Sequence, residues 1–309
     1  MNSEYIIQLE NISKSFGKTT ALADVQLSIC KGEIFGLVGP DGAGKSTILK
    51  AICGLVIPEQ GTIAVLGIDA IKGTEKLRSK LGYMPQRFSL YQDLKLTENM
   101  NFYANIFGIA KKSIPAETER FLQLTGLYEH RDKLAGQLSG GMKQKLALAV
   151  NLMHQPEILL LDEPSTGVDP VARKDFWSII NKMKEEGITI VVATPYMEEA
   201  ERCDTIALIA RGRVAASGNL PVIIDLFPYN ITNIVTHRPF ELKQIIDQKF
   251  NFVSTMIRGN AVRVISTEPS SSVEATIEHI MLESESISPA LAEVEDTFIY
   301  LTKEGASNE

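Results

Sequence analysis

The spacing of hydrophobic residues changes along the chain, and each change predicts a different kind of structure. In residues 6–29, short apolar runs alternate with polar residues, and a polar turn at residues 15–18 separates them. Such alternation favours an antiparallel β-layer with a tight turn. Residues 34–38 form a compact apolar run instead, which predicts a strand buried on both faces.

Helical spacing dominates the next part of the chain. Apolar residues recur three and four positions apart, which predicts helices at residues 45–55, 98–107, 115–126 and 140–154. Further on, apolar runs and helical segments alternate. We expect strands at residues 158–161, 188–193 and 205–210, separated by helices at residues 171–184 and 197–202. Alternation of this kind is typical of a parallel sheet with helices on its faces.

The pattern changes again near residues 218–221, where we place a domain boundary. Beyond it we expect strands at residues 231–236, 252–257 and 261–266, and helices at residues 240–249, 273–281 and 294–301. This order predicts a small α+β domain of the ferredoxin-like kind. The sequence therefore predicts two domains, residues 1–220 and 221–309, with a helical subdomain at about residues 87–155 inside the first.

Composition and charge narrow the classes of function. The chain has 309 residues, 44% of them hydrophobic, and a net charge of −7. We expect no nucleic-acid binding, because proteins that bind along nucleic acid present a basic face. No apolar run approaches the roughly 18 residues needed to span a bilayer, and residues 1–7 lack the basic and apolar regions of a signal peptide. We therefore expect a cytosolic chain that forms no pore by itself.

A glycine-rich loop follows the strand predicted at residues 34–38. It matches G-x-x-x-x-G-K-[ST], in which glycines let backbone N–H groups face inward around phosphate oxygens. Lys45 would reach the β- and γ-phosphates, Ser46 would bind Mg²⁺, and Thr47 would begin a helix whose N-terminus favours an anion. A chance glycine-rich turn is the plain alternative. The predicted nucleotide-binding residues are Gly39, Pro40, Asp41, Gly42, Ala43, Gly44, Lys45, Ser46 and Thr47.

Two acidic residues end the apolar run at residues 158–161. Asp162, at the end of a buried strand, is expected to hold the Mg²⁺ shell next to a phosphate loop. Glu163 is expected to be catalytic, because it is placed to polarise an attacking water. The plain alternative is that both acids solvate the end of a strand before Pro164.

A third motif reads Leu138-Ser139-Gly140-Gly141-Met142. Ser139 and the backbone N–H groups of Gly140 and Gly141 would form a second anion cradle at the N-terminus of the helix predicted at residues 140–154. A simple helix N-cap with glycines would have the same sequence.

Together these motifs resemble those of ATP-binding cassette (ABC) ATPases, in which the third motif closes over the ATP held by the glycine loop of a second subunit. Phe16 resembles the aromatic residue that stacks on adenine. Gln86 resembles the glutamine that senses Mg²⁺ and water, so the resemblance implies metal and catalytic roles. Asp169, in Thr166-Gly167-Val168-Asp169-Pro170, resembles part of the loop that contacts the opposite subunit. The plain alternative for Phe16 is an aromatic residue in a turn. For Gln86 it is a polar loop residue, and for Asp169 a helix N-cap.

The resemblance covers about two thirds of the chain, residues 16–210, and it implies the fold. We expect an α/β P-loop NTPase with a RecA-like parallel-sheet core, an antiparallel β-subdomain and a helical subdomain, followed by the small α+β domain. ATP and Mg²⁺ are the implied ligands.

One position departs from the family pattern. The family has a histidine after the strand that follows the aspartate–glutamate pair, where it contacts the γ-phosphate, but this chain has Pro195. Proline offers neither a side-chain donor nor a backbone N–H. Loss of one transition-state contact typically costs roughly 10²- to 10³-fold in rate. Pro195 is therefore a degenerate catalytic position in this interpretation.

Two dimers are compatible with this departure. In a heterodimer, the glycine loop of this chain forms a slow site, and its intact motif at residues 138–142 completes a fast site on a second ABC ATPase. In a homodimer, Glu163 alone suffices. We favour the heterodimer, although the retained glutamate argues for the homodimer.

The nearest resemblance is to ATPases of ABC-2-type exporters, including drug-resistance and multidrug efflux systems, which have a C-terminal extension with a segment like residues 294–302. It implies a peripheral subunit on the cytoplasmic face of the inner membrane, whose ATP-driven closure moves a separate ABC-2-type permease. Residues 86–107 would contact that permease through a groove of apolar side chains, or these side chains would simply pack in the core. The transported substrate cannot be inferred.

Two other functions remain open. Some ABC proteins act in translation or DNA repair, but this chain has neither the basic linker between fused cassettes nor the long coiled coil of those proteins. A regulatory subunit that binds nucleotide with little turnover is the other alternative.

Overall fold

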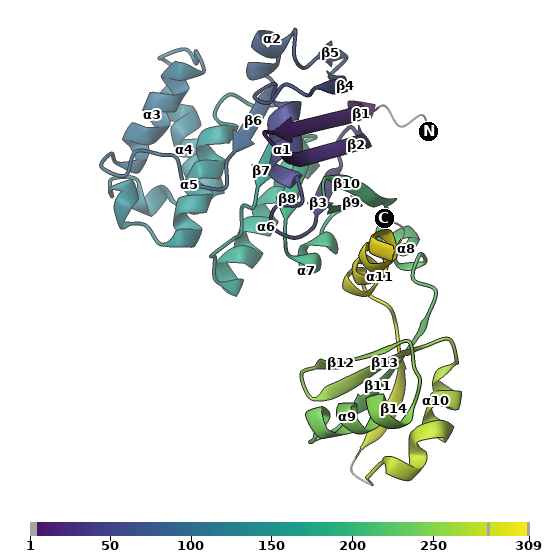
Figure 1. The fold of residues 1–309 in the computed structure, drawn as a ribbon. Coiled ribbons are helices and arrows are strands. Elements are labelled where there is room, and N and C mark those ends of the chain that lie inside the picture. Colours follow the sequence, from purple (N-terminus) through teal and green to yellow (C-terminus); the bar gives the residue numbers. More distant parts are fainter. Residues whose placement is uncertain (1–4, 283–284, 308–309) are drawn as a thin grey trace. The chain divides into compact units, whose positions relative to one another are not determined.

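The computed structural model describes residues 5–282 and 285–307. Residues 1–4, part of the segment that lacks signal-peptide features, lie outside the described residues. The chain forms two compact units, Met1–Leu220 and Pro221–Glu309 (Figure 1).

A six-stranded sheet forms the core of the first unit, in the order β10-β9-β3-β8-β7-β6. Its strands are β3 (Ile34–Val38), β6 (Leu81–Met84), β7 (Ile158–Asp162), β8 (Thr189–Thr194), β9 (Thr205–Ala210) and β10 (Arg213–Gly218). All of these strands except β10 run parallel, as the alternating pattern predicts. Every residue of β3, β7 and β8 is buried, which explains their continuous apolar sequences.

The two outer strands of this sheet, β6 and β10, were not predicted. β6 has only four residues, and β10 pairs antiparallel with β9 while every second residue is exposed. Short or half-exposed strands carry little hydrophobic periodicity, so their pairing depends on distant partners.

A second sheet, in the order β2-β1-β4-β5, forms the β-layer. β1 (Tyr5–Phe16) and β2 (Thr19–Cys30) pair antiparallel around a tight turn, which confirms the prediction. β4 (Gln60–Val65) and β5 (Ile68–Asp69), which were not predicted, join from beyond helix α1 (Lys45–Ile52). Side chains of this layer, of α1 and of the core sheet share one hydrophobic core.

Helices α3 (Leu96–Ile106), α4 (Ile114–Leu124) and α5 (Gly140–Leu152) pack together on one side of the first unit (Figure 1). Residues 87–95 contain turns rather than a helix. A short α2 (Thr74–Arg78) precedes β6, and two 3₁₀ turns (Tyr128–His130 and Ala135–Gln137) separate α4 from α5. The remaining helices of this unit are α6 (Pro170–Glu185) and α7 (Met197–Ala200). α8 (Leu220–Ile224) begins at the boundary.

The second unit has βαββαβ order. Its elements are β11 (Asn230–Val235), α9 (Pro239–Lys249), β12 (Ser254–Arg258), β13 (Ala261–Ser266), α10 (Ser270–Ile277), a 3₁₀ turn (Glu278–Ile280) and β14 (Ser286–Ala290), followed by α11 (Val294–Ser307). All neighbouring strands pair antiparallel in the order β12-β13-β11-β14, which is the ferredoxin-like arrangement. β14 was not predicted, because this edge strand is mostly exposed and contains Pro289.

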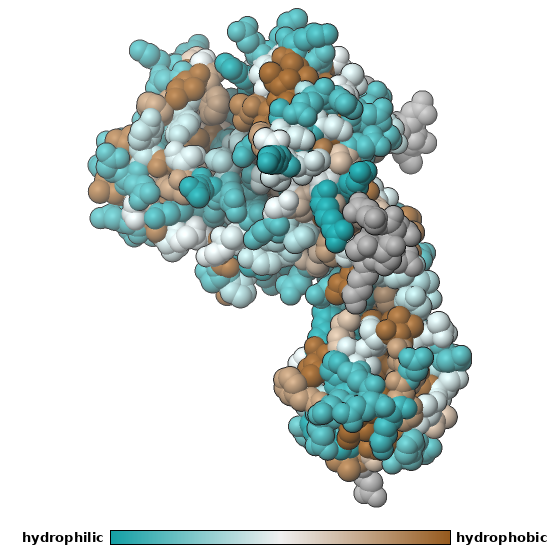
Figure 2. Space-filling model, viewed as in Figure 1, coloured by the Kyte–Doolittle hydropathy of each residue, from teal (hydrophilic) through white to brown (hydrophobic). Residues whose placement is uncertain are grey.

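Hydrophilic residues cover most of the face shown in Figure 2, and hydrophobic residues gather there only in small separate patches. Among the described residues, no helix has both the length and the apolar character needed to cross a bilayer.

A buried ion pair joins the sheet of the second unit to its last helix. The Arg263 guanidinium on β13 lies 2.9 Å from Asp296 on α11, and these side chains are 3% and 2% exposed. Arg263 also donates to Leu291 O, and Asp296 accepts the backbone N–H of Glu293 at 2.8 Å. Asp296 therefore neutralises a buried cation and caps the start of α11.

We predict that Asp296→Ala destabilises the chain by about 2–4 kcal/mol, because it leaves the Arg263 charge buried without its main partner. Calorimetric unfolding of the full chain measures this loss. The matched control is Glu295→Ala, which removes the same charge from an exposed position on the same helix and should change stability by less than about 0.5 kcal/mol. Equal losses in the two variants would contradict the prediction.

Candidate active site

The predicted site residues Gly39, Asp162 and Pro195 lie at one edge of the core sheet. Strands β3, β7 and β8 are parallel neighbours, so their carboxyl ends meet there. Gly39 follows β3, Asp162 ends β7 and Pro195 follows β8. Ligands of open α/β sheets bind at this edge.

The glycine loop is packed too tightly for larger residues at two positions. A Cβ on Gly39 would lie 2.1 Å from the carbonyl oxygen of Ile209. Gly44 has φ +109°, and a Cβ there would lie 2.7 Å from Ala21 O. Helix α1 starts at Lys45, as the apolar spacing predicts, and two residues before Thr47, where the motif placed its start. The first-turn N–H groups of α1 are therefore available to an anion.

Lys45 is a buried cation whose contacts are incomplete. It is 3% exposed, and its Nζ donates to Gly39 O at 2.7 Å and Pro40 O at 2.9 Å. Burial lowers the pKa of Lys45 below its ordinary value, and the negative charges of Glu163 and other nearby carboxylates oppose this shift. Glu163 is 3.9 Å away, at the limit of an ion pair. An ammonium held mainly by carbonyls suits a multiply charged anion such as a phosphate chain.

Ser46 and Asp162 place oxygen ligands beside the loop. Ser46 Oγ donates to Asp162 Oδ1 at 2.8 Å, and the Tyr83 hydroxyl donates to Asp162 Oδ2 at 3.2 Å. Burial and the Asp162 charge raise the pKa of Tyr83, which keeps the phenol protonated as a donor. The described residues contain no cluster of three or more His, Cys, Asp or Glu side chains able to hold a metal. The pair fits Mg²⁺, which uses one or two protein oxygens and takes the rest from phosphates and water.

Glu163 is fixed by contacts from three segments. Its Oε2 accepts from Gln86 Nε2 at 2.8 Å and from Thr166 Oγ1 at 3.2 Å, and its backbone N–H donates to Ala193 O at 2.8 Å. Its φ is +50°, a left-handed conformation that costs roughly 1–2 kcal/mol in a residue other than glycine. Strain of this kind concentrates at functional sites. A carboxylate so held can accept a proton from a water molecule.

Pro195 lies at the end of β8, beside these groups. The residue before it, Thr194, accepts the backbone N–H of Gly39 at 3.2 Å and, through Oγ1, that of Tyr196 at 3.1 Å. The turn around Pro195 is thus tied to the glycine loop by backbone atoms, and Pro195 itself adds no hydrogen-bond donor.

Residues 139–141 and Asp169 form a separate group at the N-termini of α5 and α6. Ser139 Oγ accepts from Met142 N at 3.3 Å, and Asp169 accepts from Val171 N and Ala172 N at 3.1 and 2.9 Å. A Cβ on Gly141 would lie 2.6 Å from the Ala172 Cβ. Ser139 is therefore the N-cap of α5 and Asp169 the N-cap of α6, as the plain alternative for each motif predicts. Among the described residues, the hydrogen bonds of this group stay within α5 and α6.

Phe16 ends β1 and is 52% exposed, with Lys14 Nζ 5.4 Å from the centre of its ring. An exposed ring at a strand end is free to stack on a flat partner.

The sequence did not identify three contributors to this site. Tyr83, Thr166 and Thr194 all hydrogen-bond to predicted residues or to the segments that carry them. Thr166 belongs to a predicted motif and lies three residues from Glu163, but the motif assigns it no contact. Tyr83 and Thr194 gave no local signal, because the site residues that they contact, Asp162 and Gly39, are more than seventy residues away from them.

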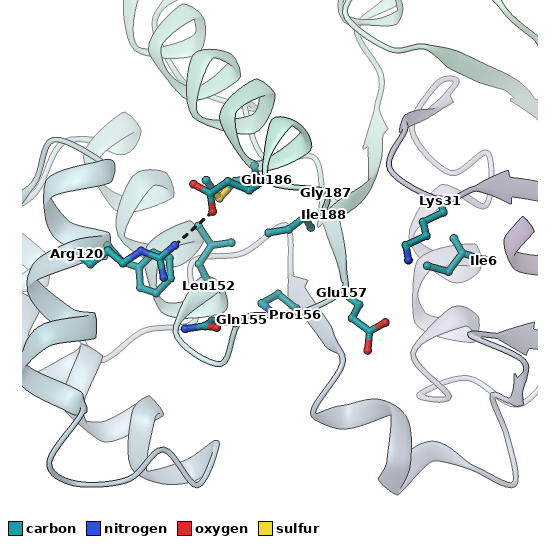
Figure 3. Close-up of a pocket in the computed structure, with 12 residues that line it drawn as sticks. Ile6, Lys31, Arg120, Leu152, Gln155, Pro156, Glu157, Glu186, Gly187 and Ile188 are labelled. Atoms are coloured by element: carbon teal, nitrogen blue, oxygen red, sulfur yellow. Dashed lines mark hydrogen bonds and ion pairs between the residues drawn. The ribbon is translucent and has the colours of Figure 1, made fainter. Parts of the chain in front are cut away.

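A cavity of about 320 Å³ lies at the opposite edge of the same sheet (Figure 3). Its lining includes Glu157 and Ile188, which precede β7 and β8, and the ion pair between Arg120 and Glu186 at 3.4 Å. It is therefore separate from the site at the carboxyl ends of the strands.

Comparison with known proteins agrees with this geometry. Residues 22–166 match the ABC transporter family. The probable multidrug ABC transporter ATP-binding protein YbhF of Escherichia coli is 44% identical over 215 residues, 70% of this chain and 37% of YbhF. The chain thus spans little more than a third of that relative. The linearmycin resistance ATP-binding protein LnrL of Bacillus subtilis is 38% identical, over 69% of each chain.

Solved structures agree as well. A dimeric ATP-binding cassette in a post-hydrolysis state, bound to ADP and Pi, matches with a TM-score of 0.64 and 27% identity. The match covers 69% of this chain and 98% of that cassette. The family match, the identity to LnrL over most of its length and the structural similarity lead to one conclusion. The chain belongs to the family of ABC transporter ATP-binding proteins.

Proposed function

We propose that this chain binds and hydrolyses ATP and thereby powers a membrane exporter of the ABC-2 type. The observation that carries the proposal is the meeting of a buried ammonium, a hydroxyl–carboxylate pair and a strained, hydrogen-bonded glutamate at one sheet edge. The ADP and Pi in the similar dimeric cassette support hydrolysis. The similarity to YbhF, a probable multidrug ABC transporter ATP-binding protein, and to LnrL, a linearmycin resistance ATP-binding protein, supports export.

In this proposal each group has one task. The glycine loop, the first turn of α1 and Lys45 bind the phosphates. Ser46 and Asp162 hold Mg²⁺, which neutralises phosphate charge when bound. Glu163 accepts a proton from the attacking water, and Gln86 orients the Glu163 carboxylate through their 2.8 Å hydrogen bond. Phe16 stacks on the adenine.

The separate group at Ser139, Gly140, Gly141 and Asp169 supports a dimer. Helix N-termini attract anions, yet the hydrogen bonds of this group stay within α5 and α6. We propose that it closes over ATP bound by a second ABC ATPase, so that each site needs two chains. A heterodimer remains our preferred arrangement because of Pro195.

The membrane partner would bind at a cavity of about 510 Å³ in the first unit. It is lined by residues before and after β6, by α3 and α5 and by Leu55, which is 62% exposed. Of the apolar residues between Gln86 and Phe107, Leu96 is buried away from this cavity, Leu90 is buried but lines it, and Ile106 lines it and is 61% exposed. We propose that a permease helix binds here, which places the chain on the cytoplasmic face of the membrane as a peripheral subunit.

The first prediction concerns the catalytic glutamate. Glu163→Gln should lower ATP turnover about 10²- to 10³-fold while ATP affinity changes less than about twofold, since a neutral amide cannot accept the proton from water. Steady-state phosphate release and equilibrium nucleotide binding measure the two effects. Glu157 directly precedes the first residue of β7, at the opposite end of the strand from Glu163. Glu157→Gln is therefore the control and should behave as wild type. Undiminished turnover in Glu163→Gln would exclude Glu163 as the base.

The second prediction concerns the glycine loop. Gly39→Ala should weaken ATP binding at least about tenfold, because its Cβ would displace the loop from the Ile209 carbonyl. Gly67→Ala is the control. Gly67 has φ +71°, and no heavy atom beyond its chain neighbours lies within 4 Å of the position that an added Cβ would take, so the change should cost about 1 kcal/mol of stability without affecting the affinity for ATP. Isothermal titration with ATP measures binding. Wild-type affinity in Gly39→Ala would show that the loop does not cradle phosphates.

The third prediction addresses Pro195, which favours a second candidate function, a regulatory subunit with little turnover of its own. Pro195→His should raise the ATPase rate of the isolated chain about tenfold or more, because it restores a transition-state donor. The rate is measured at saturating ATP with the oligomeric state recorded. An unchanged rate would count against a defect at this position and would favour the homodimer.

A further inference from the structure

Glu199 is a buried carboxylate outside the site residues described above. It lies on α7 and is 1% exposed. A charge in such a place is costly unless donors surround it, so its partners indicate what it does.

Two hydrogen-bond donors and one cation lie around a single oxygen of Glu199. Its Oε1 accepts hydrogen bonds from the Ser165 hydroxyl and from Trp177 Nε1 at 3.2 Å, and Arg173 Nε lies 3.9 Å away. The Arg173 guanidinium also stacks over the Tyr196 ring at 4.5 Å. Glu199 Oε2 has no hydrogen-bond partner among the described residues. The carboxylate is therefore held from one side, by the segments that follow β7.

These contacts join three segments that matter to the site. Ser165 lies two residues after Glu163, on the loop that runs to Asp169. Arg173 and Trp177 lie on α6, the helix that Asp169 caps. Glu199 itself lies four residues after Pro195. One carboxylate thus connects the loop with the catalytic glutamate, the helix at the dimer-facing group, and the turn at the degenerate position.

We propose that Glu199 is a positioning residue that fixes the loop at residues 163–169 against α6 and the Pro195 turn. Through Ser165 it holds the backbone that keeps Glu163 in its strained conformation. Because Glu199 lies four residues after Pro195, its contact with Ser165 also ties the Pro195 turn to the loop at residues 163–169. The side chain of Pro195 has no donor with which to make such a contact. This inference rests on the proposed ATPase activity and adds a residue through which the geometry of Glu163 is set.

The test compares two substitutions that each remove one donor to the same oxygen. Ser165→Ala releases the catalytic loop and should lower kcat about 5- to 10-fold with the Kd for ATP unchanged within about twofold, because a small displacement of the base is costly. Trp177→Phe removes a donor on the helix scaffold. It should lower the melting temperature and leave kcat within about twofold of wild type.

Glu199→Met removes both carboxylate oxygens at a similar side-chain size. It should reproduce the loss in kcat, and the double variant Ser165→Ala/Glu199→Met should be no slower than Glu199→Met alone, since both changes break one link. Additive losses would overturn the proposal. So would a wild-type kcat in Ser165→Ala, or equal losses of kcat in Ser165→Ala and Trp177→Phe, which would indicate a merely structural role.

Fluorescence separates this inference from the proposed function. Trp177 is the only tryptophan of the chain and its indole N–H donates to Glu199, so its emission reports on this carboxylate. ATP should change the emission in wild type and fail to change it in Ser165→Ala. A wild-type chain without turnover would refute the ATPase proposal, and the emission would still decide the link: an ATP response that persists in Ser165→Ala overturns it.

Discussion

The parallel pairing of β3 with β8 and of β8 with β7 is the constraint on which the rest of the structure depends. These strands are buried along their whole length, so their backbone groups must pair within the sheet, and the α6 crossover between β7 and β8 makes those two strands parallel. Because all three run the same way, their carboxyl ends deliver Gly39, Asp162 and Pro195 to one edge. Residues more than one hundred positions apart thereby become neighbours, and charge can be concentrated where backbone N–H groups also converge.

That concentration explains the electrostatics of the site. Lys45 is desolvated among carbonyls and carboxylates, and Glu163 is held in a left-handed conformation by Gln86, Thr166 and a backbone hydrogen bond. Both arrangements cost free energy in the free chain. A bound polyanion would offset the cost at Lys45, and the strained conformation of Glu163 is explained by its proposed role as the base. Beneath this edge, Glu199 ties the loop after β7 to the helix and turn around it.

Local sequence patterns were sufficient for the parts of the fold in which burial is continuous. The fully buried β3 and β7, the helices around the motifs and the ferredoxin-like order of the second unit follow from periodicity. β4, β5, β6, β10 and β14 did not follow, because they are short or half-exposed and are stabilised by strands far away in sequence. In the site, motif spacing gave the residues but not the contacts. The Gln86–Glu163 hydrogen bond and the role of Tyr83 arise only from folding, as does the burial of Glu199.

The central claim is that this edge hydrolyses ATP although Pro195 replaces a histidine. The most direct test is steady-state ATP hydrolysis by the purified full chain, with its oligomeric state followed in the presence of ATP and Mg²⁺. The account predicts ATP binding, with turnover that is slow in the isolated chain and rises when a second ABC ATPase contributes a fast site of its own, completed by residues 138–142 of this chain. No turnover at all by the folded chain with ATP bound would contradict it.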